Sequence, residues 1–191
     1  MWMFGEWGAL IVLLLIVAFA MLRSPKRRRG PPNVNHIAPT YTKSSNRQNA
    51  EVVYVIDGDT VDVRVSGRKT RVRLDAIDCP ENGQHWGDTA KFGLVKLIGG
   101  KTVHLEQHGQ DQYGRTIATI YVSHANGSKW INVNERMVTL GHAWVMRKYY
   151  SHLSKERQRQ LNRLEAWAKS KRVGLWGTSN PIPPWEWRRE T

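Results

Sequence analysis

The chain has 191 residues, a formal net charge of +13 at pH 7, one cysteine and seven histidines. This length leaves room for one domain with a sizeable core. The single cysteine excludes an internal disulfide and a zinc site built from several thiolates. The histidines are scattered and lack the spacing of zinc ligands. Because residues 51–191 still carry a charge of about +7, we expect a polyanionic partner, either nucleic acid or anionic lipid.

The first 22 residues form a segment of their own. Residues 8–22 are an uncharged apolar run, and extended back to Trp2 it reaches about twenty residues, enough for a helix to cross roughly 30 Å of hydrocarbon. Trp2 and Trp7 suit the aromatic belt at a membrane interface. The alternative is a cleaved signal peptide. Signal peptides begin with basic residues, whereas the charged residue before this apolar run is the acidic Glu6. We therefore predict a single transmembrane anchor over 1–22.

A basic linker is predicted over 23–49. It begins with the cluster RSPKRRRG, continues through further prolines and ends in a polar stretch without periodicity, so we expect it to be disordered. Arginine and lysine beside a membrane span are retained in the cytoplasm, and this rule predicts a cytoplasmic location for the domain that follows. The same basic cluster can also lie on anionic headgroups.

Strand patterns begin at Glu51, where β-branched residues alternate with polar ones, and Ser66-Gly67 then indicates a turn. The predicted strands cover 51–65, 69–78, 101–107 and 115–122. Short strands of this kind, interrupted by turn residues, favour a curled sheet around a single core.

Helical spacing of apolar residues predicts three helices, over 86–100, 132–141 and 152–174. Asp88 is expected to cap the first helix. Asn132, with Glu135 three residues later, is expected to cap the second, and Gly141 and Gly174 are expected to end the second and third. Strands and helices together predict an α+β domain over 50–177, built as a small β-barrel with appended helices.

The tail, residues 178–191, contains PIPPWEWRR. We expect a proline-stiffened strap that packs its tryptophans on the domain. The alternative is a peptide that binds a partner, although no protein partner is predicted from the sequence.

The motif DGDTV, residues 57–61, raises a question of its own. Asp57 and Asp59 stand side by side at the mouth of a predicted strand, where they repel each other unless a cation lies between them or one of them caps a turn. On these five residues alone, an Asp-Gly hairpin turn is the simpler interpretation.

Two motifs downstream change this interpretation. RLDAIDCPE ends at Glu81 and contains Arg73 and Asp78, and DQYGR ends at Arg115. Phosphodiester cleavage needs a hard divalent cation held by oxygen ligands, arginines to neutralise charge on the phosphoryl oxygens, and a carboxylate near the attacking water. The three motifs together supply these groups.

Taken in this order and spacing, DGDTV, RVRLDAIDCPE and DQYGR resemble the staphylococcal nuclease (thermonuclease) family, and the resemblance continues through VNERMVTLGHAWV and GLW, covering roughly residues 50–176. It implies a five-stranded oligonucleotide-binding (OB-fold) β-barrel with three helices. It also implies Ca²⁺ held by Asp59, Asp78 and the backbone carbonyl of Cys79, with Asp57 supporting these ligands. Because the carbonyl of Cys79 is the expected ligand, its side chain is expected to matter little.

The same resemblance implies catalytic roles. Glu81 is expected to orient or deprotonate the attacking water, and Arg73 and Arg115 to clamp the scissile phosphate. The expected reaction is endonucleolytic cleavage of DNA and RNA, preferably single-stranded, to 3′-phosphate and 5′-hydroxyl ends.

Three further residues are implied in substrate binding: Tyr113 near a terminal phosphate, and Arg147 and Tyr149 at the nucleobase. Two positions depart from the family pattern. Arg147 stands where the family has a tyrosine, and Gln112 stands where it has a lysine. Since arginine can stack on a base, base contact is expected to survive with altered preference.

Other interpretations remain open. The aspartates can be turn caps paired with arginines in surface salt bridges, and a barrel of this kind can be a catalytically weak nucleic-acid-binding module tethered to the membrane. A membrane-surface adaptor that uses the basic linker leaves the acidic residues unexplained. The compartment also stays open, because the positive-inside rule favours a cytoplasmic domain while a need for Ca²⁺ favours an exported one.

Overall fold

The computed structural model describes residues 47–123 and 130–190. The predicted anchor (1–22) and the linker up to residue 46 lie outside these ranges. Residues 47–49, which the sequence analysis placed in the linker, instead begin the first strand. Within the described ranges, no helix combines the length and the apolar character needed to cross a membrane.

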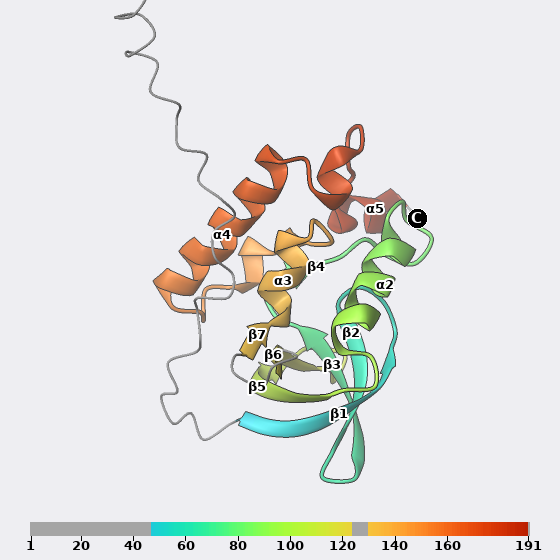
Figure 1. Ribbon diagram of the computed structural model, residues 1–191, viewed down its shortest axis with the longest axis vertical. Helices are drawn as coiled ribbons and strands as arrows, with labels where there is room; N and C mark the ends of the chain where they lie inside the picture. Colours follow the sequence, from blue (N-terminus) through green and yellow to red (C-terminus); the bar gives the residue numbers. More distant parts are fainter. Residues whose placement is uncertain (1–46, 124–129, 191) are drawn as a thin grey trace, which may run out of the picture. The chain divides into compact units, whose positions relative to one another are not determined.

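Five strands form a closed barrel (Figure 1). They are β1 (Arg47–Val55), β2 (Thr60–Val65), β3 (Arg68–Leu74), β5 (Thr102–Gln110) and β6 (Thr116–Ser123). Neighbours in the order β3-β2-β1-β5-β6 pair antiparallel, and a parallel pairing of β3 with β6, in which Val72 lies opposite Thr116, closes the ring. The predicted five-stranded barrel is confirmed.

Two predicted strands are divided in the structure. The predicted strand over 51–65 is split into β1 and β2 by a turn at 56–59. The predicted strand over 69–78 ends as β3 at Leu74, passes through Ala76, whose φ is 61°, and resumes as β4 (Ile77–Asp78). β4 leaves the barrel and pairs with β8 (Trp144–Val145), while β7 (Trp130–Asn132) pairs with β6. These breaks matter because Asp57 and Asp59 lie in the first, and Arg73 and Asp78 lie on either side of the second.

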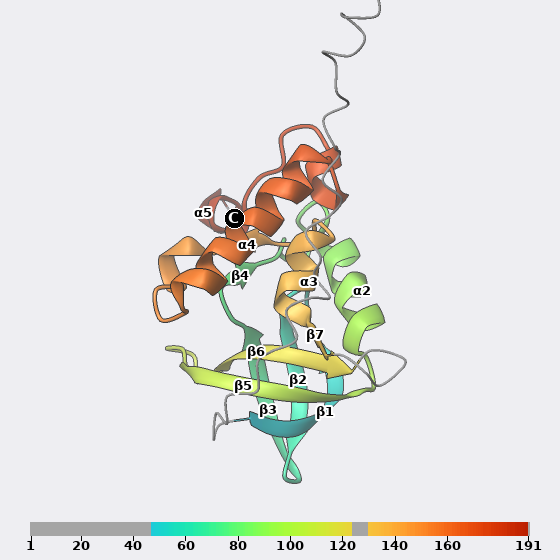
Figure 2. The same cartoon turned by 60° about the vertical axis from the view of Figure 1, so that its left-hand side comes forward.

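The three predicted helices are present as α2 (Gly87–Ile98), α3 (Val133–Thr139) and α4 (Lys155–Ser170), and the tail adds a fourth, α5 (Pro184–Glu190). Two 3₁₀ turns, η1 (Arg147–Tyr149) and η2 (Gly174–Gly177), flank α4. The helices gather at one end of the barrel in both Figure 1 and Figure 2.

Helix capping follows the sequence in one case and departs from it in another. The side chain of Asn132 accepts a hydrogen bond from the backbone N–H of Glu135 at 3.1 Å, which confirms it as the N-cap of α3. The predicted cap of α2 is wrong: the N-cap is Trp86, with φ of 75°, and Asp88 lies in the first turn. There its carboxylate still interacts favourably with the positive end of the helix dipole.

The core fills the barrel and continues under the helices. Val61, Val63, Val72, Leu105 and Ile120 are all fully buried inside the barrel strands. Ala90, Leu94 and Ile98 recur every four residues along one face of α2 and are fully buried too. The helices therefore hold the loops at this end of the barrel in fixed positions.

The tail packs against the domain. Pro184 is buried, the ring of Trp185 approaches that of Trp144 edge-on at 6.4 Å between centroids, and the side-chain amide of Gln84 donates to the carbonyl of Ile182 at 2.7 Å. These contacts bring α5 beside the loop that precedes α2.

Candidate active site

The DGDTV motif forms a tight turn and also delivers a buried acid. The side chain of Asp57 accepts a hydrogen bond from the backbone N–H of Asp59 at 2.9 Å, so Asp57 caps the turn between β1 and β2. A Cβ on Gly58 would lie 2.7 Å from the Cβ of Cys79 and 2.9 Å from that of Ala90, so only glycine fits there. The hairpin-turn interpretation and the catalytic one are therefore compatible.

Asp59 and Asp78 meet across Arg73. Asp59 is 5% exposed and Asp78 is 1% exposed. The guanidinium of Arg73, itself mostly buried, lies 2.8 Å from an oxygen of each carboxylate. The residues come from the β1–β2 turn, the end of β3 and β4, so the breaks in the two predicted strands are what bring them together.

The electrostatics at Asp59 favour a cation. Burial raises the pKa of Asp59, the charge of Arg73 opposes this, and the neighbouring Asp57 and Asp78 raise it further, to about 8. The raised pKa means that the positive charge nearby does not fully stabilise the ionised carboxylate of Asp59. The donor set of closely spaced carboxylate oxygens is the type that Ca²⁺ prefers, so these residues fit the implied ion.

Cys79 contributes more than its backbone. Its N–H donates to Asp59 at 2.7 Å, and its thiol donates to the carbonyl of Gly58 at 3.2 Å. Burial raises the pKa of the thiol, so it remains a protonated donor. The side chain therefore helps to hold the β1–β2 turn, whereas the sequence analysis expected it to matter little.

Glu81 lies at the edge of the same cluster, and Arg188 contacts it. Arg188, on α5, pairs with a carboxylate oxygen of Glu81 and lies 2.7 Å from an oxygen of Asp78. The backbone N–H of Glu81 donates to the side chain of Gln84 at 2.9 Å, and this same glutamine donates to Ile182 in the tail. The tail thus reaches both a predicted metal ligand and the predicted base.

Arg115 enters from the hairpin between β5 and β6. Asp111 accepts hydrogen bonds from the backbone N–H groups of Tyr113 and Arg115, at 2.9 and 3.0 Å, and from the Nε of Arg115 at 2.7 Å. This turn fixes the guanidinium through one nitrogen. The ring of Tyr113 is 74% exposed and lies 5.5 Å from the guanidinium carbon of Arg115.

The two residues predicted to contact a base are placed differently. Tyr149 is 59% exposed and lines the cleft. Arg147 is paired with Glu165 at 2.7 Å, and that glutamate also accepts from the backbone N–H of Val145 at 2.9 Å. The structure thus gives Arg147 a role in holding β8 against α4.

Most of the predicted groups line one cleft, whereas Asp78, Cys79 and Arg147 do not; Asp78 is joined to the cleft through its contact with Arg73. Asp57, Asp59, Arg73, Glu81, Tyr113 and Arg115 all line it. Gln84 and Arg188, which contact Glu81, were not predicted from the sequence, and neither was Asp111, which holds Arg115. Arg188 lies 107 residues from Glu81 along the chain, so no local pattern could connect them, although the pair of arginines at 188 and 189 in the tail was a visible signal.

Comparisons with known proteins give a consistent result. A family model described as Staphylococcal nuclease homologue matches residues 71–178. Protein ParB of Escherichia coli is 40% identical over 144 residues, 74% of this chain and 79% of that protein. Micrococcal nuclease of Shigella flexneri is 39% identical over 142 residues (73% and 79%), and an uncharacterized endonuclease of Haemophilus influenzae is 38% identical over 148 residues (77% and 76%). With the closed barrel and the shared cleft, these matches place the chain in the staphylococcal nuclease family.

Proposed function

We propose that this chain is a Ca²⁺-dependent endonuclease that hydrolyses phosphodiester bonds in DNA and RNA, preferably single-stranded, to 3′-phosphate and 5′-hydroxyl ends. The observation that carries this proposal is the convergence of the β1–β2 turn, the β3–β4 region and the β5–β6 hairpin on one cleft. This convergence places two buried carboxylates, a partly exposed glutamate and two arginines together.

Asp59, Asp78 and the backbone carbonyl of Cys79 would hold the cation, which when bound would polarise the phosphate and orient water. Asp57 contributes by capping the turn that carries Asp59. Because Cys79 N–H and Arg73 already bond to Asp59, the carboxylate is fixed in place before any ligand arrives.

The remaining residues handle the proton and the growing charge. Glu81 accepts a proton from the attacking water, whose oxygen bonds to phosphorus. The P–O5′ bond then breaks, and the leaving O5′ oxygen takes a proton from solvent water to become the 5′-hydroxyl. Arg73 and Arg115 donate to the phosphoryl oxygens as their negative charge grows. Tyr113 and Tyr149, both exposed, offer ring faces on which unpaired bases can stack, and this favours single strands.

The proposal is tested with the full-length protein and labelled single-stranded DNA and RNA. Cleavage is expected with Ca²⁺, to be lost with a chelator and to be much weaker with Mg²⁺, which is smaller and requires stricter octahedral geometry. The products are analysed for 3′-phosphate ends. Full activity in chelator contradicts the calcium requirement, and binding without cleavage supports the nucleic-acid-binding module instead.

The contact of Arg188 with Asp78 leads to a second prediction. Its guanidinium occupies carboxylate oxygens that the cation needs, so calcium must compete with it. Arg188→Ala is expected to bind Ca²⁺ several-fold more tightly, since the Arg188 side chain is 44% exposed and solvent weakens its contact with the buried Asp78 to about 1 kcal/mol. Isothermal titration calorimetry without nucleic acid measures this.

Arg189→Ala is the matched control, because it removes the same charge from the neighbouring exposed position of α5. Its Ca²⁺ affinity is expected to stay close to that of the wild type. Unchanged or weaker calcium binding by Arg188→Ala shows that the contact does not compete with the ion.

We further propose that residues 1–22 anchor the protein in a membrane. The apolar run and the basic cluster after it support this, and the positive-inside rule favours a cytoplasmic domain. The full-length protein is expected to stay in the membrane pellet after a carbonate wash, with its N-terminus intact. Recovery of a soluble form trimmed near residue 22 supports a cleaved signal peptide and an exported domain instead.

A further inference from the structure

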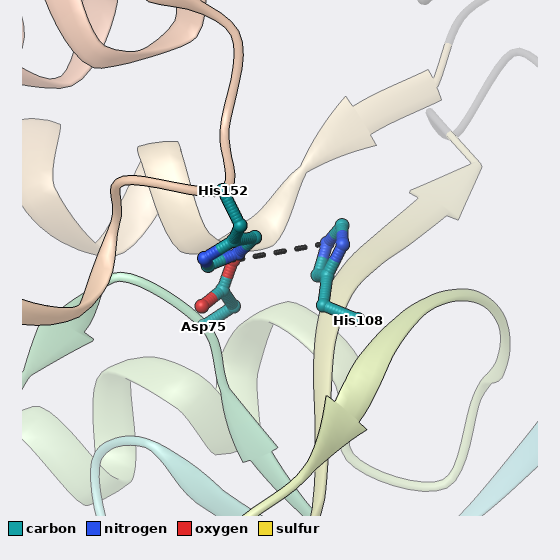
Figure 3. Close-up of side chains that lie close together, drawn as sticks. All are labelled: Asp75, His108 and His152. Atoms are coloured by element: carbon teal, nitrogen blue, oxygen red, sulfur yellow. Dashed lines mark hydrogen bonds and ion pairs between the residues drawn. The ribbon is translucent and has the colours of Figure 1, made fainter.

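Asp75, His108 and His152 come together from three separate segments (Figure 3). Asp75 follows β3, His108 lies near the end of β5, and His152 lies in the loop between η1 and α4. The Nε2 of His152 is 2.8 Å from the Oδ2 of Asp75, and the Nε2 of His108 is 3.7 Å from the same oxygen. One potential ligand atom of each residue lies within 4.8 Å of the other two.

These spacings suit a small metal ion. Zinc binds imidazole nitrogen and carboxylate oxygen at about 2.0–2.2 Å, so two donors on one tetrahedral zinc ion lie roughly 3.3 Å apart. The distances from Asp75 Oδ2 to His152 and His108, 2.8 and 3.7 Å, bracket that value. Only small side-chain movements are needed to place an ion among the three groups.

The donor types differ from those of the calcium site. Two imidazole nitrogens and one carboxylate are preferred by Zn²⁺ and related first-row ions, whereas Ca²⁺ prefers oxygen ligands throughout. We propose that Asp75, His108 and His152 form a second metal site that binds Zn²⁺, separate from the carboxylates of Asp59 and Asp78. This inference stands independently of the proposed nuclease activity.

The surroundings of the cluster are compatible with a bound cation. Asp75 is buried and supplies the negative charge, and burial lowers the pKa of His108, which keeps its imidazole neutral and able to coordinate. Arg157, whose positive charge acts on His108, is paired with Glu106 at 3.3 Å and donates to Thr119. The Nε2 of His108 also lies 2.9 Å from Thr119 Oγ1, so binding an ion there replaces that hydrogen bond.

The side chain of His152 is 39% exposed, and all three residues line the cleft, so water can complete the coordination. An ion at this point would join the end of β3 and β5 to the loop that connects Tyr149 to α4. A bound ion would therefore also restrain the loop beside Tyr149, on one side of the cleft.

The experiment titrates Zn²⁺ into metal-stripped full-length protein by calorimetry, with saturating Ca²⁺ present to occupy the acidic site. Wild type is expected to bind one ion at this cluster, and Co²⁺ added in place of Zn²⁺ is expected to give the visible absorption of nitrogen ligation. His152→Ala is expected to weaken Zn²⁺ binding on the order of 100-fold, since even residues that only support a ligand change affinity by 10–100-fold. Because His152 also contacts the buried Asp75, the melting temperature of this variant is measured alongside to show that it remains folded.

Two further variants make the result decisive. His85→Ala removes an exposed histidine from another loop and is expected to leave the Zn²⁺ affinity unchanged. Asp59→Ala is expected to keep Zn²⁺ binding even though it impairs the calcium site. The proposal is overturned if wild type takes up no Zn²⁺, if His152→Ala binds it as wild type does, or if Asp59→Ala abolishes it.

Discussion

Arg115→Ala is expected to lower the rate of nucleic-acid cleavage by about 100-fold to 1000-fold, while substrate affinity falls much less. Asp111 holds Arg115 through Nε and through the turn backbone, so the terminal nitrogens remain to donate to a phosphate. A donor fixed in this way stabilises the transition state most, as charge builds on the phosphoryl oxygens, because the guanidinium does not have to reorient. The loss should therefore appear in turnover rather than in binding.

Single-turnover cleavage and equilibrium binding, measured on the same labelled oligonucleotide, separate the two effects. Arg64→Ala is the matched control, because Arg64 pairs with Glu51 in an exposed contact and its removal takes away the same charge. A loss of affinity equal to the loss of rate means that Arg115 binds the ground state as strongly as the transition state.

Glu81→Gln is expected to reduce turnover by about 100-fold or more without weakening substrate binding, because the amide keeps the shape of the carboxylate but cannot accept the proton of water. The backbone N–H of Glu81 bonds to Gln84, so the position of the side chain should be retained. The new amide oxygen can still accept from Arg188, which keeps the tail contact available.

Calcium affinity and thermal stability are measured in parallel for Glu81→Gln, and both are expected to stay near the wild-type values. Lys155→Ala, on the exposed start of α4, serves as a control that should lower affinity in a salt-dependent way and leave turnover alone. Wild-type turnover in Glu81→Gln removes this residue from the proton transfer.

Much of the fold could be predicted because the local signals agree. Alternating β-branched residues gave the barrel strands, and Asn132 with Glu135 gave the start of α3. The break at 56–59 shows the limit of periodicity. The β-branched pattern continues on both sides of it and predicted one strand over 51–65, whereas the Asp-Gly pair at 57–58 indicated the turn that ends the hydrogen-bonded ladder. The cap of α2 was missed because Trp86 adopts a left-handed conformation that its residue type does not indicate.

Site residues that lie inside a sequence motif could be predicted. Residues that are far apart in the sequence and meet only in the folded structure could not. Asp59, Asp78 and Arg73 lie within 20 residues of one another, and the structure places Arg73 between the two acids. His108 and His152 are 44 positions apart on different elements, so their sequence spacing could not indicate the metal site proposed above. Arg147 was assigned to the substrate by resemblance, and this assignment stays a prediction; its contact with Glu165 depends on the packing of α4, which no motif describes.

The proposed nuclease activity is tested most directly by measuring cleavage rate and binding affinity together, with Ca²⁺, for wild type, Arg115→Ala and Glu81→Gln on one single-stranded oligonucleotide. We expect that wild type cleaves, that both variants cleave at least about 100-fold more slowly, and that all three bind with similar affinity. Wild-type turnover in both variants, or a wild type that binds but does not cleave, contradicts the proposed activity.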